Sequence, residues 1–275
     1  MKQTPEWNLA ALLQSPLFAP LHPILADLEA GGFPTLQDCN ALLTSRPLLI
    51  TVQSGSPLRF VAQECGKLPF EAQYEPRCYL KGEVQMRAHN WHDLLNALVW
   101  LTFPKTKSIL NARHYDALIE ERASAIPRRG AVRDVNTLLD ESGVIVVYAD
   151  TDLAELLRNF NWKELFWQRR EQVRAGMGFY LFGHGLYEKA LQPYVGMTGQ
   201  GLLLAVEPVF FSWPLAQQLA YLDSLLADYL AALEHCRSTR DLSPVPLLGV
   251  PGWAADNNCA AYYDNTAYFR PGRRG

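Results

Sequence analysis

The stretch NWHDLLNALVWLTFP, residues 90–104, decides the expected fold. Asn90 is a strong helix N-cap residue, because its side-chain oxygen can accept a backbone N–H of the first turn. Leucines then recur at three- and four-residue spacing, at Leu94, Leu95, Leu98 and Leu101. Such an apolar stripe is typical of a helix that packs against a core. The helix is expected to end before Pro104, because the residue before a proline avoids the helical conformation.

Further helices are expected on both sides of this stretch. Upstream, apolar spacing predicts helices over His22–Ala30 and Leu36–Leu43, the second capped by Thr35. Residues 1–46 are therefore expected to form a helical N-terminal region. Downstream, helices are expected at residues 105–123, 152–159, 162–173 and 186–191, and from Pro214 to about His235.

Strands are expected to be few and short. Residues 47–88 look extended and rich in turns, with candidate strands at Ile50–Gln53, Leu58–Ala62 and Cys78–Met86. The all-apolar run Val144–Tyr148 predicts a buried strand, preceded by one helical turn at 134–139 and a plain turn at 140–143. Glycines interrupt the segment 176–185, and residues 196–201 are expected to form a turn. The tail 241–275 is expected to be irregular and to pack on the domain.

No break in composition divides the chain. The expected fold is therefore α+β, a mainly helical single domain over residues 1–275 with a small sheet.

Composition excludes several classes of protein. The 275 residues carry 25 Lys and Arg against 28 Asp and Glu, so the formal charge of −3 excludes bulk binding to nucleic acid. The best apolar run, Leu202–Phe211, is broken by Glu207 and Pro208, which argues against a membrane span. The N-terminus lacks the unbroken apolar run of a secretory signal. A cytoplasmic protein is expected, and its oligomeric state stays open.

Common catalytic motifs are missing from the sequence. The five cysteines include no CxxC pair, which favours free thiols over disulfides or a thiolate zinc site. Neither GxSxG nor HExxH occurs, and the glycines at 196–201 lack the lysine of a phosphate-binding loop.

Histidines in polar clusters are the strongest chemical signal. In the first cluster, RAHNWHD at 87–93, His92 shares a helical face with Asn96 and adjoins Asp93. Imidazole and carboxylate together suit a divalent metal or a general base. The structural alternative is that Asn90 and Asp93 cap the helix while the histidines pack at its start.

Two further clusters could complete a site. His114 ends the segment NARH at 111–114, where pairing on the surface with Asp116 or Glu120 is the alternative. His184 and Glu188 stand four residues apart, a spacing that can chelate a metal. The glycines beside His184 allow conformational freedom and close backbone approach. Alternatively, His184 caps the helix and Glu188 forms an ion pair with Lys189 or Arg174.

Two acidic pairs lie between these clusters. Arg133-Asp134 and Asp140-Glu141 could each supply carboxylates to a mixed nitrogen and oxygen site. The plain turn is the favoured interpretation of residues 140–143.

Four segments carry a family resemblance: NWHDLLNALVWLTFPKTKSILNARH, LLDESGVIVVYAD, LFGHGLYEKALQPYVGMTG and GVPGW…YYDNTAYFRP. They resemble the bacterial family labelled domain of unknown function 3025, over about two thirds of the chain from near Tyr74 to Pro271. The resemblance implies a bacterial, single-domain, cytoplasmic protein and no particular reaction. Candidate residues that fall within these motifs are His92, Asp93, Asn96, His114, His184 and Glu188.

A looser resemblance concerns His92-Asp93, which is similar to the His-Asp dyad of metal-dependent phosphohydrolases with an all-helical core. Those proteins have another histidine on an earlier helix and an aspartate on a later one. His22 and either Asp134 or Asp140 would take these places here, but a turn-rich region separates His22 from the dyad.

The leading hypothesis is a metal-dependent hydrolase that acts on a phosphoester or another small anionic substrate. Its divalent metal (Zn, Mn or Fe) would be held by His92, His114, His184 and Glu188, with Asp140 as a spare ligand. Asp93 would orient a ligand or act as the general base. Arg113 or Arg133 would neutralise the negative charge of the substrate. Trp91 and Trp162 would form walls of the pocket.

The alternative hypothesis is a non-enzymatic binding or scaffold protein. Its His, Asp and Asn clusters would then be buried structural networks, which can rigidify a core without catalysing a reaction.

Overall fold

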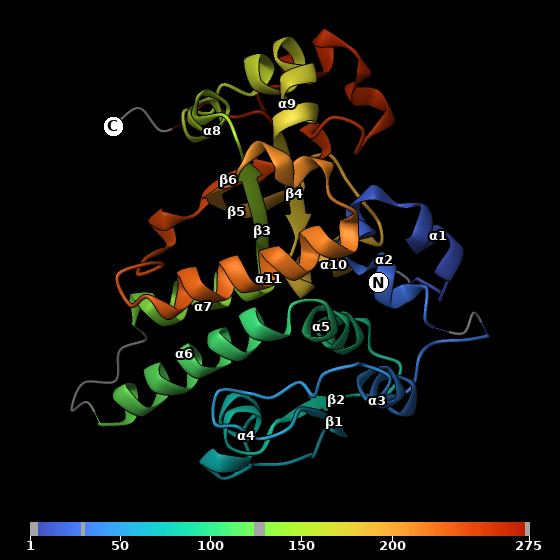
Figure 1. Cartoon of the computed structure of the whole chain (residues 1–275), viewed down its shortest axis with the longest axis vertical. Helices are drawn as coiled ribbons and strands as arrows, with labels where there is room; N and C mark the ends of the chain where they lie inside the picture. Colours follow the sequence, from blue (N-terminus) through green and yellow to red (C-terminus); the bar gives the residue numbers. More distant parts are fainter. Residues whose placement is uncertain (1–4, 29–30, 124–129, 273–275) are drawn as a thin grey trace.

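The computed structural model describes residues 5–28, 31–123 and 130–272. It confirms a mainly helical α+β architecture with two small sheets (Figure 1). The helices are α1 (Leu9–Gln14), α2 (His22–Leu25), α3 (Leu36–Thr44), α4 (Tyr74–Lys81), α5 (Trp91–Thr102), α6 (Pro104–Ala123), α7 (Ala131–Ser142), α8 (Thr151–Arg158), α9 (Arg170–Gly176), α10 (His184–Ala190) and α11 (Leu215–Ala231). The strands are β1 (Arg59–Ala62), β2 (Glu83–Met86), β3 (Gly143–Tyr148), β4 (Met177–Leu181), β5 (Thr198–Ala205) and β6 (Ser243–Pro246).

The larger sheet has the strand order β4-β3-β5-β6, and β1 and β2 form a separate parallel pair. Within the larger sheet, β3 runs antiparallel to β4 and parallel to β5. Its residues Val144–Val147 are fully buried, which fits the all-apolar run and the central position of the strand. In Figure 1 the helices α8 and α9 lie at one end of this sheet, and α7, α10 and α11 lie toward the other.

Helix α5 is the central helix of the core. Asn90 caps it as expected, since its Oδ1 accepts the backbone N–H of Asp93 at 3.0 Å. Every residue from Leu94 to Leu101 is buried, so the helix is covered on all sides rather than along one stripe. The chain leaves α5 at Phe103 and enters α6 at Pro104, and the expected end before Pro104 is confirmed.

Several expected strands and turns are wrong. Residues 78–81 belong to helix α4, which ends at Gly82 in a left-handed conformation with φ of 69°, so the strand begins only at Glu83. Residues 50–53 form no strand and contribute one isolated bridge, between Thr51 and Pro57. The segment 176–185 contains strand β4.

The turn expected at 196–201 is confirmed only at Gly196, which has a φ of 111°, because strand β5 begins at Thr198. Gly199 and Gly201 are needed there because side chains of neighbouring strands, such as Val144 and Val245, occupy the space above them. The helix expected at 162–173 is divided into a π-helical turn at Glu164–Gln168 and helix α9. Helix α11 ends at Ala231, short of His235.

The two terminal regions agree largely with expectation. Helices fill most of residues 9–44, but α2 ends at Leu25, short of the expected Ala30, and residues 31–35 lie outside the helices. Thr35 forms a capping box with Asp38 at the start of α3. The tail from residue 241 consists of short turns, apart from β6, which pairs with β5.

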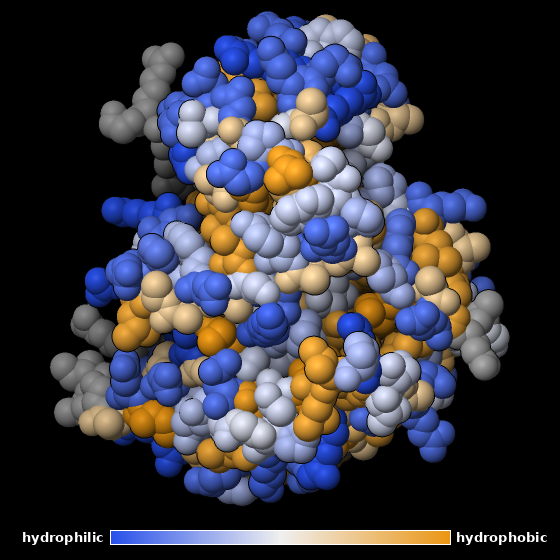
Figure 2. All heavy atoms as spheres, in the orientation of Figure 1, coloured by the Kyte–Doolittle hydropathy of each residue, from blue (hydrophilic) through white to orange (hydrophobic). Residues whose placement is uncertain are grey.

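Two further features of the fold are the hydropathy of its surface and the lengths of its helices. Figure 2 shows hydrophobic residues in several separate areas among hydrophilic ones on the face seen in Figure 1. Among the described residues, none of the helices combines the length and the apolar character needed to cross a membrane.

The start of α6 is buried, and Asp223 of α11 supplies its cap. The Asp223 carboxylate accepts the backbone N–H of Lys105 at 3.1 Å and that of Thr106 at 2.8 Å. Asp223 is only 4% exposed, so water cannot replace it as the acceptor.

We therefore expect Asp223→Ala to lower the free energy of unfolding by about 1–3 kcal/mol, because the buried N–H of Thr106 and the partly buried N–H of Lys105 lose their acceptor. Urea denaturation measures this change. Asp228→Ala, on the exposed side of the same helix, is the matched control and should stay within about 0.5 kcal/mol of the parent. Equal stability of the two variants would contradict the capping role.

Candidate functional site

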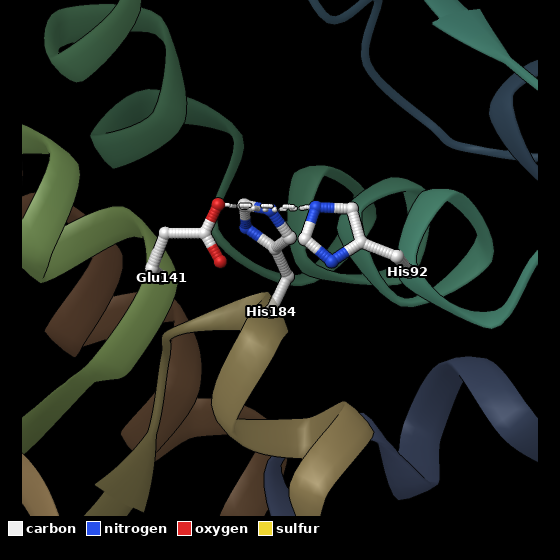
Figure 3. Close-up of side chains that lie close together, drawn as sticks. All are labelled: His92, Glu141 and His184. Carbon is white, nitrogen blue, oxygen red and sulfur yellow. Dashed lines mark hydrogen bonds and ion pairs between the residues drawn. The ribbon is translucent and has the colours of Figure 1, made fainter. Parts of the chain in front are cut away.

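Three side chains from three helices converge on one point (Figure 3). His92 comes from the first turn of α5, Glu141 from the last turn of α7 and His184 from the first residue of α10. The Nε2 atoms of the two histidines are 3.1 Å apart. The Oε1 atom of Glu141 lies 3.8 Å from Nε2 of His92 and 3.6 Å from Nε2 of His184.

The opposite nitrogen of each ring faces another carboxylate. Nδ1 of His92 lies 3.1 Å from Oε2 of Glu188, and Nδ1 of His184 lies 3.7 Å from Oδ2 of Asp140. A carboxylate beside Nδ1 favours a proton on that nitrogen and leaves the Nε2 lone pair free. The Nε2 atoms of both rings point to the place where Glu141 also points, and Nδ1 of His184 is buried without a hydrogen-bond partner among the described residues.

Close backbone approach brings α7 and α10 together. Helix α7 passes directly into β3 at Gly143, and the carbonyl of Gly143 accepts the N–H groups of Phe182 at 3.0 Å and Gly183 at 2.9 Å. A Cβ atom on Gly183 would lie 2.5 Å from the backbone nitrogens of Ser142 and Gly143. Only glycine fits there, and His184 is consequently held beside the end of α7.

Gly185 leaves room for the Glu141 side chain. A Cβ atom at Gly185 would overlap the Glu141 carboxylate. The φ angle of Gly183 is −62°, so close approach rather than an unusual conformation explains the glycine before His184.

The Asp140 carboxylate beside Nδ1 of His184 is part of a buried ion pair. Lys107 of α6 donates to Asp140, and the two side chains are 4% and 14% exposed. Burial opposes ionisation of Asp140, but the charges of Lys107 and His184 outweigh it and hold the pKa of Asp140 at about 2. Asp140 is therefore a carboxylate at neutral pH.

Burial sets the protonation states of the site. It lowers the pKa of His184 to about 4, so this imidazole is neutral at neutral pH, as a metal ligand must be. Burial also raises the pKa of Glu141. His184 is only 6% exposed, while the side chains of His92 and Glu141 are 33% and 41% exposed. The point of convergence is thus reached from the His92 and Glu141 side.

A cavity of about 240 Å³ adjoins the three residues. Every residue in its lining is polar: Gln63, Tyr74, Glu75, Gln85, Arg87, His92, Asp93, Asn96, Asp140, Glu141 and His184. His92 and Glu141 also line a wider hollow of about 540 Å³, together with Gly185 and Glu188.

The structure brings together most of the residues singled out as metal ligands. His92 and His184 face each other directly, while Glu188 and Asp140 stand behind them on their Nδ1 sides. His114 is buried and close enough to Asp140 to help lower its pKa, but it does not reach the point where the ligands converge.

The three residues singled out for catalysis are placed differently. Asp93 lines the cavity, but Arg87 donates to its carboxylate from the backbone, Nε and Nη2, each at 2.7 Å. Arg113 is buried elsewhere and donates to the carbonyl of Leu230, in the last turn of α11, and to that of Cys236, beyond the helix. Arg133 pairs with Glu121. Neither Arg113 nor Arg133 lines the cavity.

The sequence allowed Asp140-Glu141 as a source of carboxylates but favoured a plain turn there, and Glu141 was not among the expected metal ligands. Residues 140–143 are in fact the end of α7 and the start of β3, which fixes the direction of the Glu141 side chain. One sequence signal could have pointed to Glu141. The acidic pair Asp140-Glu141 stands just before the apolar run that predicts a buried strand.

The resemblance to the helical phosphohydrolases does not extend to their histidine on an earlier helix. His22 contacts the carbonyls of Leu12 and Ser15, each at 3.2 Å, and is not part of the converging group. Its role is to hold the N-terminal turns together.

The glycines around His184 make a testable pair. Gly183→Ala places a methyl group against backbone, which cannot move freely, so we expect the free energy of unfolding to fall by at least about 2 kcal/mol. Gly185→Ala meets mainly the flexible end of Glu141, so we expect a smaller loss of stability and a displaced carboxylate. Urea denaturation in the presence of a chelator measures both.

Gly176→Ala, with no atom within 4 Å of the added methyl, is the control. A stable Gly183→Ala variant would contradict the close approach of the two backbones.

Comparison with known proteins places the chain in a family. Residues 58–273 match the model of a family described as "Protein of unknown function (DUF3025)". No curated protein and no solved structure matches the chain. The match begins upstream of the segments that carried the resemblance and includes all three converging residues. The chain belongs to the DUF3025 family.

Proposed function

We propose that His92, Glu141 and His184 bind a divalent transition metal, and that the protein is a metal-dependent hydrolase of small molecules. The observation that carries the proposal is the arrangement of the two imidazoles. Both direct Nε2 at one point beside a carboxylate oxygen, and both direct Nδ1 at a further carboxylate. A carboxylate behind a ligating histidine is a recurring feature of metal sites.

Charge supports the proposal. Two imidazole Nε2 atoms 3.1 Å apart, with a carboxylate oxygen at 3.6 Å and 3.8 Å, need a cation or a proton between them, because all three atoms carry partial negative charge. The point equidistant from the three atoms is about 2.0 Å from each, which is the length of a zinc–nitrogen bond. A metal ion therefore fits without movement of the backbone.

Geometry favours zinc among the candidate metals. Ligand atoms around a tetrahedral ion are about 3.4 Å apart, and around an octahedral ion of the same bond length about 3.0 Å apart. Two of the three observed separations, 3.6 and 3.8 Å, lie nearer the tetrahedral value, while the separation of 3.1 Å between the two Nε2 atoms lies nearer the octahedral one. Iron and manganese, which prefer octahedral sites, are the competing metals.

Two histidines and one carboxylate leave a coordination position open, as in catalytic zinc sites. A metal held there would lower the pKa of a bound water molecule to about 7 and so supply a nucleophile near neutral pH. Glu188 and the Lys107–Asp140 pair would fix the two rings. Glu75 lines the cavity, and in the described part of the chain its carboxylate accepts a hydrogen bond from Asn111, whereas Arg87 occupies the carboxylate of Asp93. Glu75 would therefore be freer than Asp93 to contact a bound water.

The first prediction from this proposal is near-stoichiometric metal. Elemental analysis of tag-free protein, purified without chelator and dialysed, should give about one zinc per chain. Glu141→Gln and His92→Ala should lose the metal but remain folded, because both side chains are partly exposed. His22→Ala is the histidine control and should retain it.

No metal after purification, and none taken up on titration, would refute the proposal and favour the scaffold interpretation. In that case the same substitutions would act on stability alone.

The second prediction concerns Glu188. Its removal leaves Nδ1 of His92 without a fixed acceptor, so Glu188→Ala should weaken metal binding about 10–100-fold. Competition with a chromophoric chelator measures the affinity. Lys189→Ala, the exposed neighbour on α10, should leave it unchanged. Equal affinities of the two variants would show that Glu188 does not support the ligand.

A further inference from the structure

The hollow of about 540 Å³ beside the three converging residues differs in character from the smaller cavity. Four apolar or aromatic residues line one part of it: Pro5, Trp91, Leu191 and Tyr194. In contrast, every residue in the lining of the smaller cavity is polar. His92 and Glu141 belong to both linings, so the proposed metal position adjoins a polar space and a partly apolar one.

The apolar part of the hollow is accessible from solvent. Tyr194 is 47% exposed, and Leu191 is partly exposed. His92 and Glu141 also keep exposed surface, so a ligand in the hollow has access to the apolar wall and to two of the three converging residues. A single exposed apolar residue is ordinary on a protein surface, whereas apolar residues gathered in a hollow are typical of a ligand site.

Contacts within the protein hold both sides of this apolar wall. Nε1 of Trp91 donates to the carbonyl of Pro5 at 2.8 Å, and the ring of Trp7 packs against Trp91 with 5.5 Å between the ring centroids. Tyr194 lies in a turn closed by Met197, whose N–H donates to the Tyr194 carbonyl at 3.1 Å. Because the wall is preformed, a ligand that binds there orders few protein groups, which favours affinity.

Helix α10 connects the apolar wall to the proposed metal position. It begins at His184, and Leu191 is its C-cap. At a rise of about 1.5 Å per residue, Leu191 lies about 10 Å along the helix from His184. An apolar group packed against Leu191 is therefore only a few bonds away from a group that binds the metal.

From these observations we propose that the hollow binds an apolar, ring-sized group of the substrate. The substrates are then amphipathic small molecules, with an apolar group on one side of the reacting bond and a polar group on the other. This inference rests on the proposed function and names its substrate class. Affinity comes from the apolar surface that the ligand and the side chains of Leu191 and Tyr194 remove from water. The polar cavity holds the other part of the substrate.

Two hydroxamic acids that share one metal-binding group test the proposal. Acetohydroxamic acid carries a methyl group, whereas 3-phenylpropanohydroxamic acid carries a benzene ring on a short linker, which suits the distance that α10 sets. We expect the phenyl probe to bind the zinc-loaded protein at least about tenfold more tightly in calorimetric titrations, because its ring is buried against the apolar wall. The zinc content after each titration shows whether a probe has removed the metal.

Two substitutions locate the ring. Tyr194→Ser and Leu191→Ser each make the wall more polar, and each should reduce the preference for the phenyl probe at least about threefold. The zinc content and the affinity for acetohydroxamic acid should stay the same, because neither residue is among the three that converge. Leu233→Ser, at an exposed leucine that does not line the hollow, is the matched control and should keep the preference. If Leu191→Ser fails to fold, Tyr194→Ser alone decides.

The outcomes separate this inference from the proposed function. Equal affinities of the two probes, or a preference that the substitutions at positions 191 and 194 leave unchanged, would overturn the inference, while a zinc content near one per chain would still support the metal site. If the protein takes up no zinc, the proposed function fails, and the inference that rests on it fails with it.

Discussion

The contact of Gly183 with the junction of α7 and β3 is the constraint on which the rest of the site depends. Two N–H groups at the end of β4 converge on the carbonyl of Gly143, and the backbones come too close for any side chain between them. This single approach joins the edge of the sheet to two helix ends. Asp140 and Glu141 belong to one end, and His184 belongs to the other. The third residue, His92, is fixed independently, because the buried helix α5 cannot rotate without disrupting the core.

The site is therefore built from rigid elements. Its three converging residues lie on regular helices, and buried pairs such as Lys107–Asp140 hold the surroundings. A buried ion pair adds little net stability when it is compared with an apolar pair, but it is costly to disrupt. Such a pair is explained more readily by the need to orient His184 than by stability alone. The hydrolase and scaffold interpretations share this network and differ in whether an ion completes it.

Sequence reasoning succeeded where the signal is local. The cap at Asn90, the capping box at Thr35 and the apolar run of β3 each depend on neighbours within a few residues. It failed where distant contacts decide, as for the glycines of β5, whose role is set by side chains of other strands. His92 and His184 could be singled out by residue type and spacing. Their meeting, and the part of Glu141, depend on the register of β3 against β4, which no local pattern records.

The long chain separation of the three residues has a consequence for folding. Zinc ligands that are close in sequence can be gathered by the ion while the chain is still unfolded. Here about 45 residues separate each residue from the next, and closing such loops around an ion costs considerable entropy. The sheet must consequently pair in register before the three side chains meet, since a slip of one residue between β3 and β4 would turn His184 away. An ion that recognises only this arrangement would bind after folding, across two long loops, and would stabilise the finished fold without guiding the chain toward it.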